Sequence, residues 1–405
     1  MALQEFSADE TRRRLLQTSL FGALAAFVSG NVVGCGRGSD ARVSQTPVPV
    51  QPFGPLQGPD ANGVRLPNGF EARIVARSGV TPMLGTGFNW HAAPDGGATF
   101  ATQDSGWIYV SNSEVANQGG GVGALRFDSA GQLIDAYSIL SGTNRNCAGG
   151  PTPWGTWLSC EEVAGGNVWE CDPFGGFSSF RLPALGAFTH EAAAIDPVSG
   201  IVYMTEDEPD GCFYRFTSDG ITLGGLPDLM TGLLQVAEVI DGLEGRVQWH
   251  DVLDPAGVVV PTRLQVAVST PFNRGEGLWF DSGFVYMATT GDNRIWAYDV
   301  RIGEIAVLYD DDFFIDPILN GVDTLTVSSR GDILVAEDGD DMQLVALTLN
   351  GDVVPILQVI GHDNSEITGP AFDPSGARLY FSSQRGTTGL GQDGVTFEVQ
   401  GPFPT

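Results

Sequence analysis

The sequence predicts an all-β fold, and more specifically a six-bladed β-propeller with a metal site at the mouth of its central channel. Apolar runs are short and rich in Val, Ile, Tyr, Phe and Trp, and 55 glycines and 24 prolines supply turns between them. A loose unit of about fifty to sixty residues recurs along the chain. Acidic residues stand where successive runs end, as in VYMTEDE and ILVAEDGDD. Repeats arranged in a ring would bring these acids together around one axis.

The first part of the chain is typical of an export signal rather than of a folded domain. Residues 1–35 contain the twin-arginine pattern TRRRLLQ, an apolar stretch of moderate length, and a VVGC sequence that resembles a lipobox with Cys35 as the acylated residue. A transmembrane helix is the alternative. Residues 36–66 are rich in Pro, Gly, Gln and Ser without periodicity, which predicts a flexible tether, and residues 67–405 are expected to form a single propeller domain. We therefore expect export by the twin-arginine route and a periplasmic or cell-surface protein anchored by a lipid on Cys35.

Each repeat is expected to hold an inner strand, a turn such as Asp-Pro-x-x-Gly, a second strand, a polar turn and a third strand. The clearest copy is HEAAAIDPVSGIVYMTEDEPDGCFYRF at 190–216. About six copies fit the chain from residue 67 onward, which is a common number of propeller blades. The other copies lie at 90–140, 146–162, 275–300, 322–353 and 369–386.

The repeats place acidic residues at two points of each unit. The innermost strand of a blade lies along the channel, so residues at its start, Glu191, Glu276 and Asp323, are expected to point into the mouth. Acids at the end of the second strand would join them, beside the thiol of Cys160. The alternatives are separate solvated turns of a β-sandwich and a disulfide at Cys160. The expected metal ligands are Cys160, Glu161, Glu162, Glu191, Glu206, Asp207, Glu276, Asp323, Glu337 and Asp338.

The charge of the chain excludes some partners. A formal net charge of -29 argues against a basic surface for nucleic acid and against attraction to anionic lipid. Most of the 49 acidic residues serve solubility on the simplest interpretation. The clustered ones need another explanation, because packing carboxylates together is unfavourable unless a cation neutralises them.

Four cysteines follow the signal, and an exported protein meets an oxidising compartment. With Cys160 taken as a metal ligand, at most one disulfide can form among Cys147, Cys171 and Cys212. We expect that disulfide to join Cys171 and Cys212.

Several motifs together resemble the PhoX-type alkaline phosphatase family, bacterial metallophosphatases exported by the twin-arginine route. The resemblance implies a six-bladed propeller that carries calcium and iron at one end. It also implies that Cys160 is the iron-ligating thiolate and that Arg274 is a catalytic arginine that holds the phosphate. Glu206, Glu276 and the acids of the Glu337-Asp338 motif would belong to the shared iron and calcium site. Members of the family are often longer, and the Gln384-Arg385-Gly386 segment lacks the histidine expected after the glutamine. The motifs are Asn146 to Glu162 (NCAGGPTPWGTWLSCEE), His190-Glu191, Thr205-Glu206-Asp207, RGEGLW from Arg274, GDNR from Gly291, and VAEDG from Val335.

The resemblance implies an exported phosphatase that scavenges phosphate by hydrolysing phosphate monoesters with a cluster of Ca²⁺ and Fe³⁺. Its expected partners are small phosphate esters, with no nucleic acid polymer, with membrane contact only through the lipid anchor, and with the protein a monomer. Two alternatives stay open: a calcium-stabilised surface propeller that binds a ligand or partner without catalysis, and another propeller hydrolase such as a lactonase. The four histidines show no His-x-x-x-His zinc spacing, and no Gly-x-x-x-x-Gly-Lys phosphate loop occurs.

Overall fold

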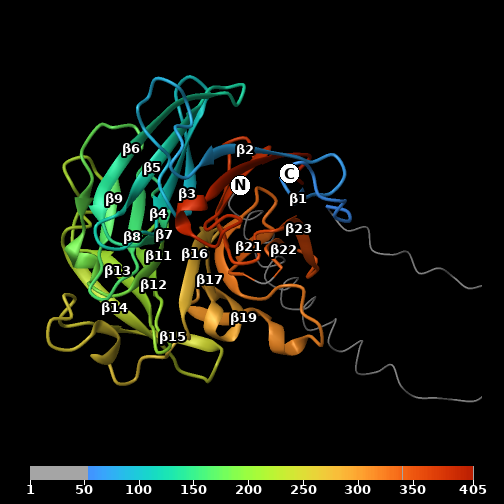
Figure 1. The fold of residues 1–405 in the computed structure, drawn as a ribbon. Coiled ribbons are helices and arrows are strands. Elements are labelled where there is room, and N and C mark those ends of the chain that lie inside the picture. Colours follow the sequence, from blue (N-terminus) through green and yellow to red (C-terminus); the bar gives the residue numbers. More distant parts are fainter. Residues whose placement is uncertain (1–52, 340, 405) are drawn as a thin grey trace, which may run out of the picture.

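The computed structural model describes residues 53–339 and 341–404, which form an all-β, propeller-like arrangement of five sheets (Figure 1). Four sheets have four or five strands, and one has nine. The prediction of an all-β, propeller-like fold is therefore confirmed. The expected signal of residues 1–35, the expected acylation site Cys35 and most of the expected tether lie outside the described residues.

The strands of the first two sheets and of the nine-stranded sheet follow one another in the chain and pair antiparallel. In the nine-stranded sheet, two series of strands meet where β15 pairs with β19 through only two residue pairs. These strands are β3 (Pro94–Ala101), β4 (Trp107–Ser113), β5 (Gly120–Phe127) and β6 (Leu133–Thr143); β7 (Asn146–Pro151), β8 (Trp157–Glu161), β9 (Val168–Cys171) and β10 (Phe180–Arg181); β11 (His190–Ile195), β12 (Val202–Glu206), β13 (Phe213–Ser218), β14 (Gly232–Val239), β15 (Gly245–Asp251), β16 (Gly275–Asp281), β17 (Phe284–Thr289), β18 (Arg294–Asp299) and β19 (Glu304–Asp310).

The last two sheets each take one strand from the beginning of the described chain. Strand β1 pairs with β23, and β2 pairs with β26, so the N-terminal part closes the C-terminal sheets. Figure 1 shows β1 beside β23. The strands are β1 (Val64–Arg65), β20 (Val322–Val327), β21 (Ile333–Glu337), β22 (Gln343–Leu347) and β23 (Val353–Val359); and β2 (Glu71–Arg77), β24 (Ile367–Phe372), β25 (Arg378–Ser383) and β26 (Val395–Gln400).

The expected boundary between tether and domain is too late in the chain. Phe53, Val64 and Leu66 are buried in one apolar cluster with residues of β21, β22 and β23. Apolar side chains in a segment otherwise rich in Pro and Gly bury enough surface to hold it against the fold. The packed part therefore already includes Phe53, although the tether was expected to reach residue 66.

Six inner strands surround the centre of the fold. Contacts run from β3 to β7, β11, β16, β20 and β24 and back to β3, which closes a ring. Small residues allow the inner strands to approach one another. A Cβ on Gly150 would lie 1.7 Å from the carbonyl oxygen of Ala193 on the next inner strand, and one on Gly277 would lie 2.7 Å from the Cα of Thr324. These contacts explain why the inner strands are rich in Gly and Ala rather than in bulky β-formers.

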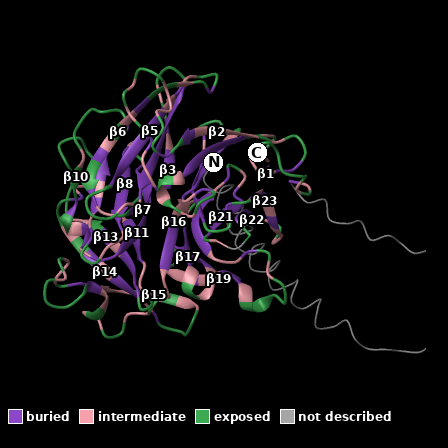
Figure 2. Ribbon diagram, in the orientation of Figure 1, coloured by how far each residue is buried: buried purple, intermediate pink, exposed green. Residues whose placement is uncertain are grey.

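The apolar core lies between neighbouring sheets, and buried residues follow the strands while exposed residues follow the loops (Figure 2). Leu158 of β8, for example, shares a cluster with Met204 of β12 and Tyr214 of β13. The predicted repeat has only three strands, whereas the sheets also contain outer strands, such as β6, the fourth of its sheet, and β15, the fifth of its series. They alternate between exposed and partly buried residues, so their apolar signal is weak. Among the described residues, no helix has the length and apolarity needed to cross a membrane.

Candidate metal centre

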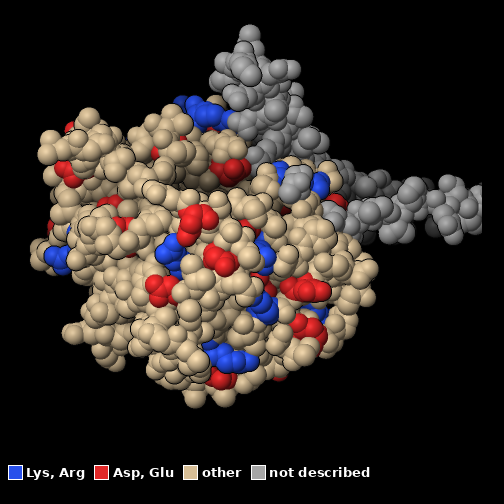
Figure 3. All heavy atoms as spheres, turned by 90° about the horizontal axis from the view of Figure 1, so that it is seen from above, with Lys and Arg blue, Asp and Glu red and all other residues tan. Residues whose placement is uncertain are grey.

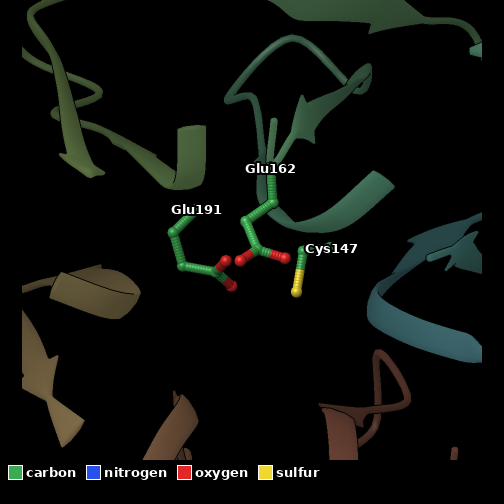
Figure 4. Close-up of side chains that lie close together, drawn as sticks. All are labelled: Cys147, Glu162 and Glu191. Atoms are coloured by element: carbon green, nitrogen blue, oxygen red, sulfur yellow. The ribbon is translucent and has the colours of Figure 1, made fainter. Parts of the chain in front are cut away.

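Three groups of acidic and thiol side chains gather at one end of the inner strands. Within each group the potential ligand atoms lie within 4.8 Å of one another. Two groups share Glu191, which links them into one larger cluster. Figure 4 shows the side chains of Cys147, Glu162 and Glu191 pointing toward one another, with ribbon segments on all sides. The groups are Cys147, Glu162 and Glu191; Glu191, Glu276 and Asp323; and Asp95, Glu114 and Glu366.

The inner strands supply one residue each at an equivalent point, which we call the channel position: the second residue of the strand. Directly after it, every inner strand shows a shift in register with the second strand of its unit. Such irregularities re-aim side chains, so one local distortion repeated around the ring turns this position toward the axis. The channel positions are Asp95, Cys147, Glu191, Glu276, Asp323 and Thr368.

A second set of residues stands directly after the second strand of each unit, at what we call the shoulder position. Its backbone N–H donates to the carbonyl oxygen of the residue directly before the inner strand, which we call the rim position, at 2.8–3.1 Å in every unit. The shoulder residues are Glu114, Glu162, Asp207, Thr290, Asp338 and Gln384. The rim residues are Ala93, Arg145, Thr189, Arg274, Gly321 and Glu366.

Burial and mutual repulsion perturb the carboxylates strongly. Burial first, and then like-charged neighbours, raise the pKa of Glu191, Glu276 and Asp323 well above the ordinary range. Burial, with the Glu114 and Asp207 carboxylates, raises the pKa of Glu162 to about 8. Burial and the charge of Asp95 also raise the pKa of the Cys147 thiol. Without cations, this cluster would have to hold protons at neutral pH.

Glu191 shows most directly that the cluster fits a cation. Its side chain is fully buried, and neither carboxylate oxygen has a hydrogen-bond partner among the described residues. An unpaired buried carboxylate is strongly unfavourable, whereas a bound cation would neutralise it. Glu191 also belongs to two of the three groups, so one carboxylate could bridge two ions.

The structure corrects the choice of cysteine. Cys160 is fully buried in an apolar cluster with Leu158, Val168 and Met204, and it belongs to none of the three groups. Cys147 instead occupies the channel position of its inner strand, equivalent to Glu191. Cys160 stands near the end of its second strand, where residues that face the core and residues that face the channel are adjacent.

Three of the expected acidic ligands have structural partners instead. Glu161, Glu206 and Glu337 are the last residues of their second strands, and each accepts a hydrogen bond from the backbone N–H six residues later. Glu161 and Glu337 each accept a second backbone N–H, and Glu206 also binds the Tyr214 hydroxyl and Arg263. These carboxylates fix the turn between the second and third strands.

Glu162, Asp207 and Asp338 directly follow these three glutamates. Because successive side chains of a strand point to opposite sides, theirs point away from the turn and toward the cluster. Glu162 is therefore in a candidate ion site, and the Asp207 and Asp338 carboxylates lie close enough to raise the pKa of nearby groups. Of the ten expected ligands, the structure brings Glu162, Glu191, Glu276 and Asp323 into the candidate groups.

Sequence reasoning missed Asp95, Glu114, Cys147 and Glu366. A signal was present: in PDGGA and NCAGG, Asp95 and Cys147 are followed by small residues, as Glu191 is in HEAAA. Aligning these starts would have found both channel residues. Glu366 has no such pattern, because it stands at the rim position of its unit.

The expected disulfide between Cys171 and Cys212 is absent. Cys147, Cys160, Cys171 and Cys212 are all free thiols. Cys171 lies in the cluster between the first two sheets, whereas Cys212 packs with Met204 and Tyr214. Spacing along the chain could not show that different sheets separate these two thiols.

Arg274 lies at the rim of the cluster. Its Nε and Nη2 donate to the two carboxylate oxygens of Asp207 at 2.8 Å, and Nη2 also reaches Glu276 at 3.1 Å. A bidentate pair of this kind fixes the orientation of both the Arg274 guanidinium and the Asp207 carboxylate. Figure 3 shows other basic and acidic side chains close together on one face of the molecule. All 20 basic residues of the chain are arginines.

The fold and the site together define a class of protein, a propeller-like protein with clustered carboxylates that could hold metal ions. The family model for alkaline phosphatase PhoX matches residues 123–169 and 164–312. The solved structure of Pseudomonas fluorescens PhoX in complex with vanadate, a transition state analogue, matches with a TM-score of 0.69 and 17% identity, over 87% of this chain and 98% of that one. These two matches support the PhoX alkaline phosphatase family and, with it, the enzyme class of phosphoric monoester hydrolases.

Two other solved structures are less similar. A gluconolactonase from Xanthomonas campestris has a TM-score of 0.47 and 14% identity, over 87% of this chain and 99% of that one. A Bacteroides thetaiotaomicron protein of unknown function has a TM-score of 0.48 and 11% identity, over 82% of this chain and 76% of that one. TM-scores below 0.5 do not establish a shared fold. A search of curated protein sequences gives no match.

Proposed function

We propose that this protein is an exported, metal-dependent phosphatase that releases phosphate from small phosphate monoesters. The observation that carries the proposal is the fully buried, unpartnered carboxylate of Glu191, which two groups of potential ligands share. The match to the PhoX family supports phosphate esters as substrates. A hydrolase of this class needs to neutralise a phosphate dianion, and a mouth of carboxylates can do so only after binding several positive charges.

We assign calcium and iron to the cluster on the chemistry of its donors. The group of Glu191, Glu276 and Asp323 offers hard oxygen ligands, which suit Ca²⁺. The group of Cys147, Glu162 and Glu191 adds a thiolate, which suits Fe³⁺. The ions, when bound, would supply Lewis acidity at the phosphoryl group.

The side chains of the chain itself position the reaction. Arg274 locks Asp207 and Glu276 in place, and its remaining Nη1 has no partner among the described residues and could donate to a phosphoryl oxygen. The inner strands hold the channel residues rigidly, because their backbones are in direct contact. Phosphoryl transfer requires catalytic groups that are held in a precise position relative to the substrate, and a rigid set of inner strands provides this.

Three further assignments complete the proposal. The closed ring of six inner strands, with equivalent rim, channel and shoulder positions, supports a six-bladed propeller in which the nine-stranded sheet is two blades joined at their outer edges. The twin-arginine pattern and Cys35 support export and a lipid anchor, with residues 1–35 as the signal. We propose that the protein acts as a monomer.

Activity and metal content together test the function. We expect the purified protein to contain calcium and iron, to be coloured by charge transfer from thiolate to iron, and to hydrolyse a chromogenic phosphomonoester until a chelator is added. Cys147→Ser should lose iron, colour and activity, while Cys160→Ser, the matched control, should keep all three. Calcium-dependent stabilisation without turnover would instead indicate a binding module, and colour that depends on Cys160 would contradict the assigned site.

A further inference from the structure

Arg145 occupies the same structural position as Arg274. Both stand at the rim position, directly before an inner strand, and the carbonyl oxygen of each accepts the N–H of the shoulder residue of its unit: Glu162 to Arg145 at 2.8 Å, and Thr290 to Arg274 at 3.0 Å. The other four rim residues are Ala93, Thr189, Gly321 and Glu366, so these two are the only arginines in the ring of rim residues.

The backbone at these two arginines is in the left-handed region. Arg145 has φ of 43° and Arg274 has φ of 56°, where side chains other than glycine are disfavoured. The rim residues Ala93 and Gly321 share this conformation, whereas Thr189 and Glu366 do not. Glycine would be the unstrained choice at such a position, so an arginine there suggests a function for its side chain.

The two guanidinium groups differ in what they bind. The fork of Arg274 is occupied by Asp207 and Glu276. The side chain of Arg145 is 49% exposed, and its one ion pair among the described residues is a loose contact of 3.7 Å between Nη1 and Glu114. A hydrogen-bonded pair would be shorter than about 3.2 Å, so the donor fork of Arg145 is not committed.

Arg145 also lies beside the candidate metal centre. Burial raises the pKa of both Glu162 and Glu114, and the nearby charge of Arg145 offsets part of this increase. These two glutamates belong to different groups of potential ligands. Arg145 also stands two residues before Cys147, which is the second residue of β7. A planar fork at the edge of a cation cluster matches an oxyanion that the cations attract.

We propose that Arg145 is a second substrate-binding arginine, which donates its free fork to the phosphoryl group held at the mouth of the channel. This assignment rests on the proposed function, because that function places a phosphate ester at this mouth. Under this proposal the two rim arginines have different roles. Arg274 mainly holds Asp207 and Glu276 in position, and Arg145 supplies the bidentate contact to the anion.

Inorganic phosphate binding to the calcium-loaded protein, measured by titration calorimetry, tests the proposal without requiring turnover. Charge-assisted hydrogen bonds of this kind lead us to expect that Arg145→Gln weakens phosphate binding by about 10- to 100-fold, with Arg145→Lys between it and wild type. Calcium affinity of Arg145→Gln should be equal or higher, because a positive charge leaves the mouth. A residue that only supports the structure would weaken the binding of both calcium and phosphate.

Arg145→Gly separates the side chain from the backbone. Glycine relieves the left-handed strain, so the melting temperature should be maintained or raised while phosphate binding falls as in Arg145→Gln. Arg126, which pairs with Asp104 away from the candidate groups, provides the matched control: Arg126→Gln should bind phosphate within about twofold of wild type.

The outcomes distinguish this proposal from the proposed function. A wild-type protein that binds phosphate through Arg145 but does not hydrolyse a chromogenic phosphomonoester would refute the function and support the inference. A wild-type protein that does not bind phosphate, or an Arg145→Gln protein that binds it within about twofold of wild type, would overturn the inference.

Discussion

Glu162→Gln should change how the stability of the metal-free protein depends on pH. Burial and neighbouring carboxylates raise the pKa of Glu162 from 4.5 to about 8 in the folded state. Between these values the folded protein keeps this proton while the unfolded chain has lost it. The unfolded state therefore binds fewer protons, and the free energy of unfolding falls as pH rises from about 5 to about 8.

The size of the effect follows from the shift. A shift of about 3.5 units, at 1.36 kcal/mol per unit, corresponds to about 5 kcal/mol lost by the upper end of the range. This is an upper limit, because Glu114 and Asp207 share the repulsion with Glu162. Glutamine carries no charge at any pH, so the slope of stability against pH should be shallower in the variant by up to about 1.4 kcal/mol per pH unit.

Urea unfolding of the chelator-treated protein, at several pH values between about 5 and 8, measures this slope. Glu161→Gln is the matched control: its carboxylate is one residue away but accepts two backbone N–H groups, so the wild-type slope should remain. Adding Ca²⁺ to the wild type should flatten the slope, because the cation replaces the proton. Parallel slopes for wild type and Glu162→Gln would refute the argument that an uncompensated carboxylate at Glu162 limits the stability of the metal-free protein.

Three other outcomes follow from the structure. Glu191→Gln should raise the melting temperature of the metal-free protein and reduce the increase that Ca²⁺ produces, because it removes a buried charge that only a cation neutralises; calorimetry in chelator and in calcium measures both, and a lower metal-free melting temperature would contradict the assignment. Cys160→Ser should cost about 1–3 kcal/mol in urea unfolding, because it places a hydroxyl in an apolar cluster, and an unchanged midpoint would show that the cluster is more polar than described. Glu398→Gln should lower stability by about 1–3 kcal/mol, because Arg73, Arg378 and Tyr380 lose a shared buried partner in the sheet that β2 closes; wild-type stability would mean that this closure does not depend on the ion pairs.

The sequence by itself determined the all-β class, the repeat and the existence of an acidic centre. These features depend on local information. Short β-forming runs and turn residues repeat along the chain, and the starts of the inner strands at Glu191, Glu276 and Asp323 were identified correctly from that repeat. The outer strand β15 lies in none of the predicted copies, because none of its residues is fully buried and its apolar pattern is correspondingly weak.

The tertiary structure decided which neighbouring residue faces the channel. Adjacent residues of a strand point to opposite sides, so an error of one position exchanges a ligand for a core residue. Glu161 and Glu162 illustrate this, since the first fixes a turn and the second lies in the candidate centre. The choice between Cys160 and Cys147 required the register of two strands and the distortion that follows each channel position. Closure of the ring places β24 beside β3 and so brings Glu366 near Asp95. This contact joins the two ends of the described chain, and no local pattern contains that information.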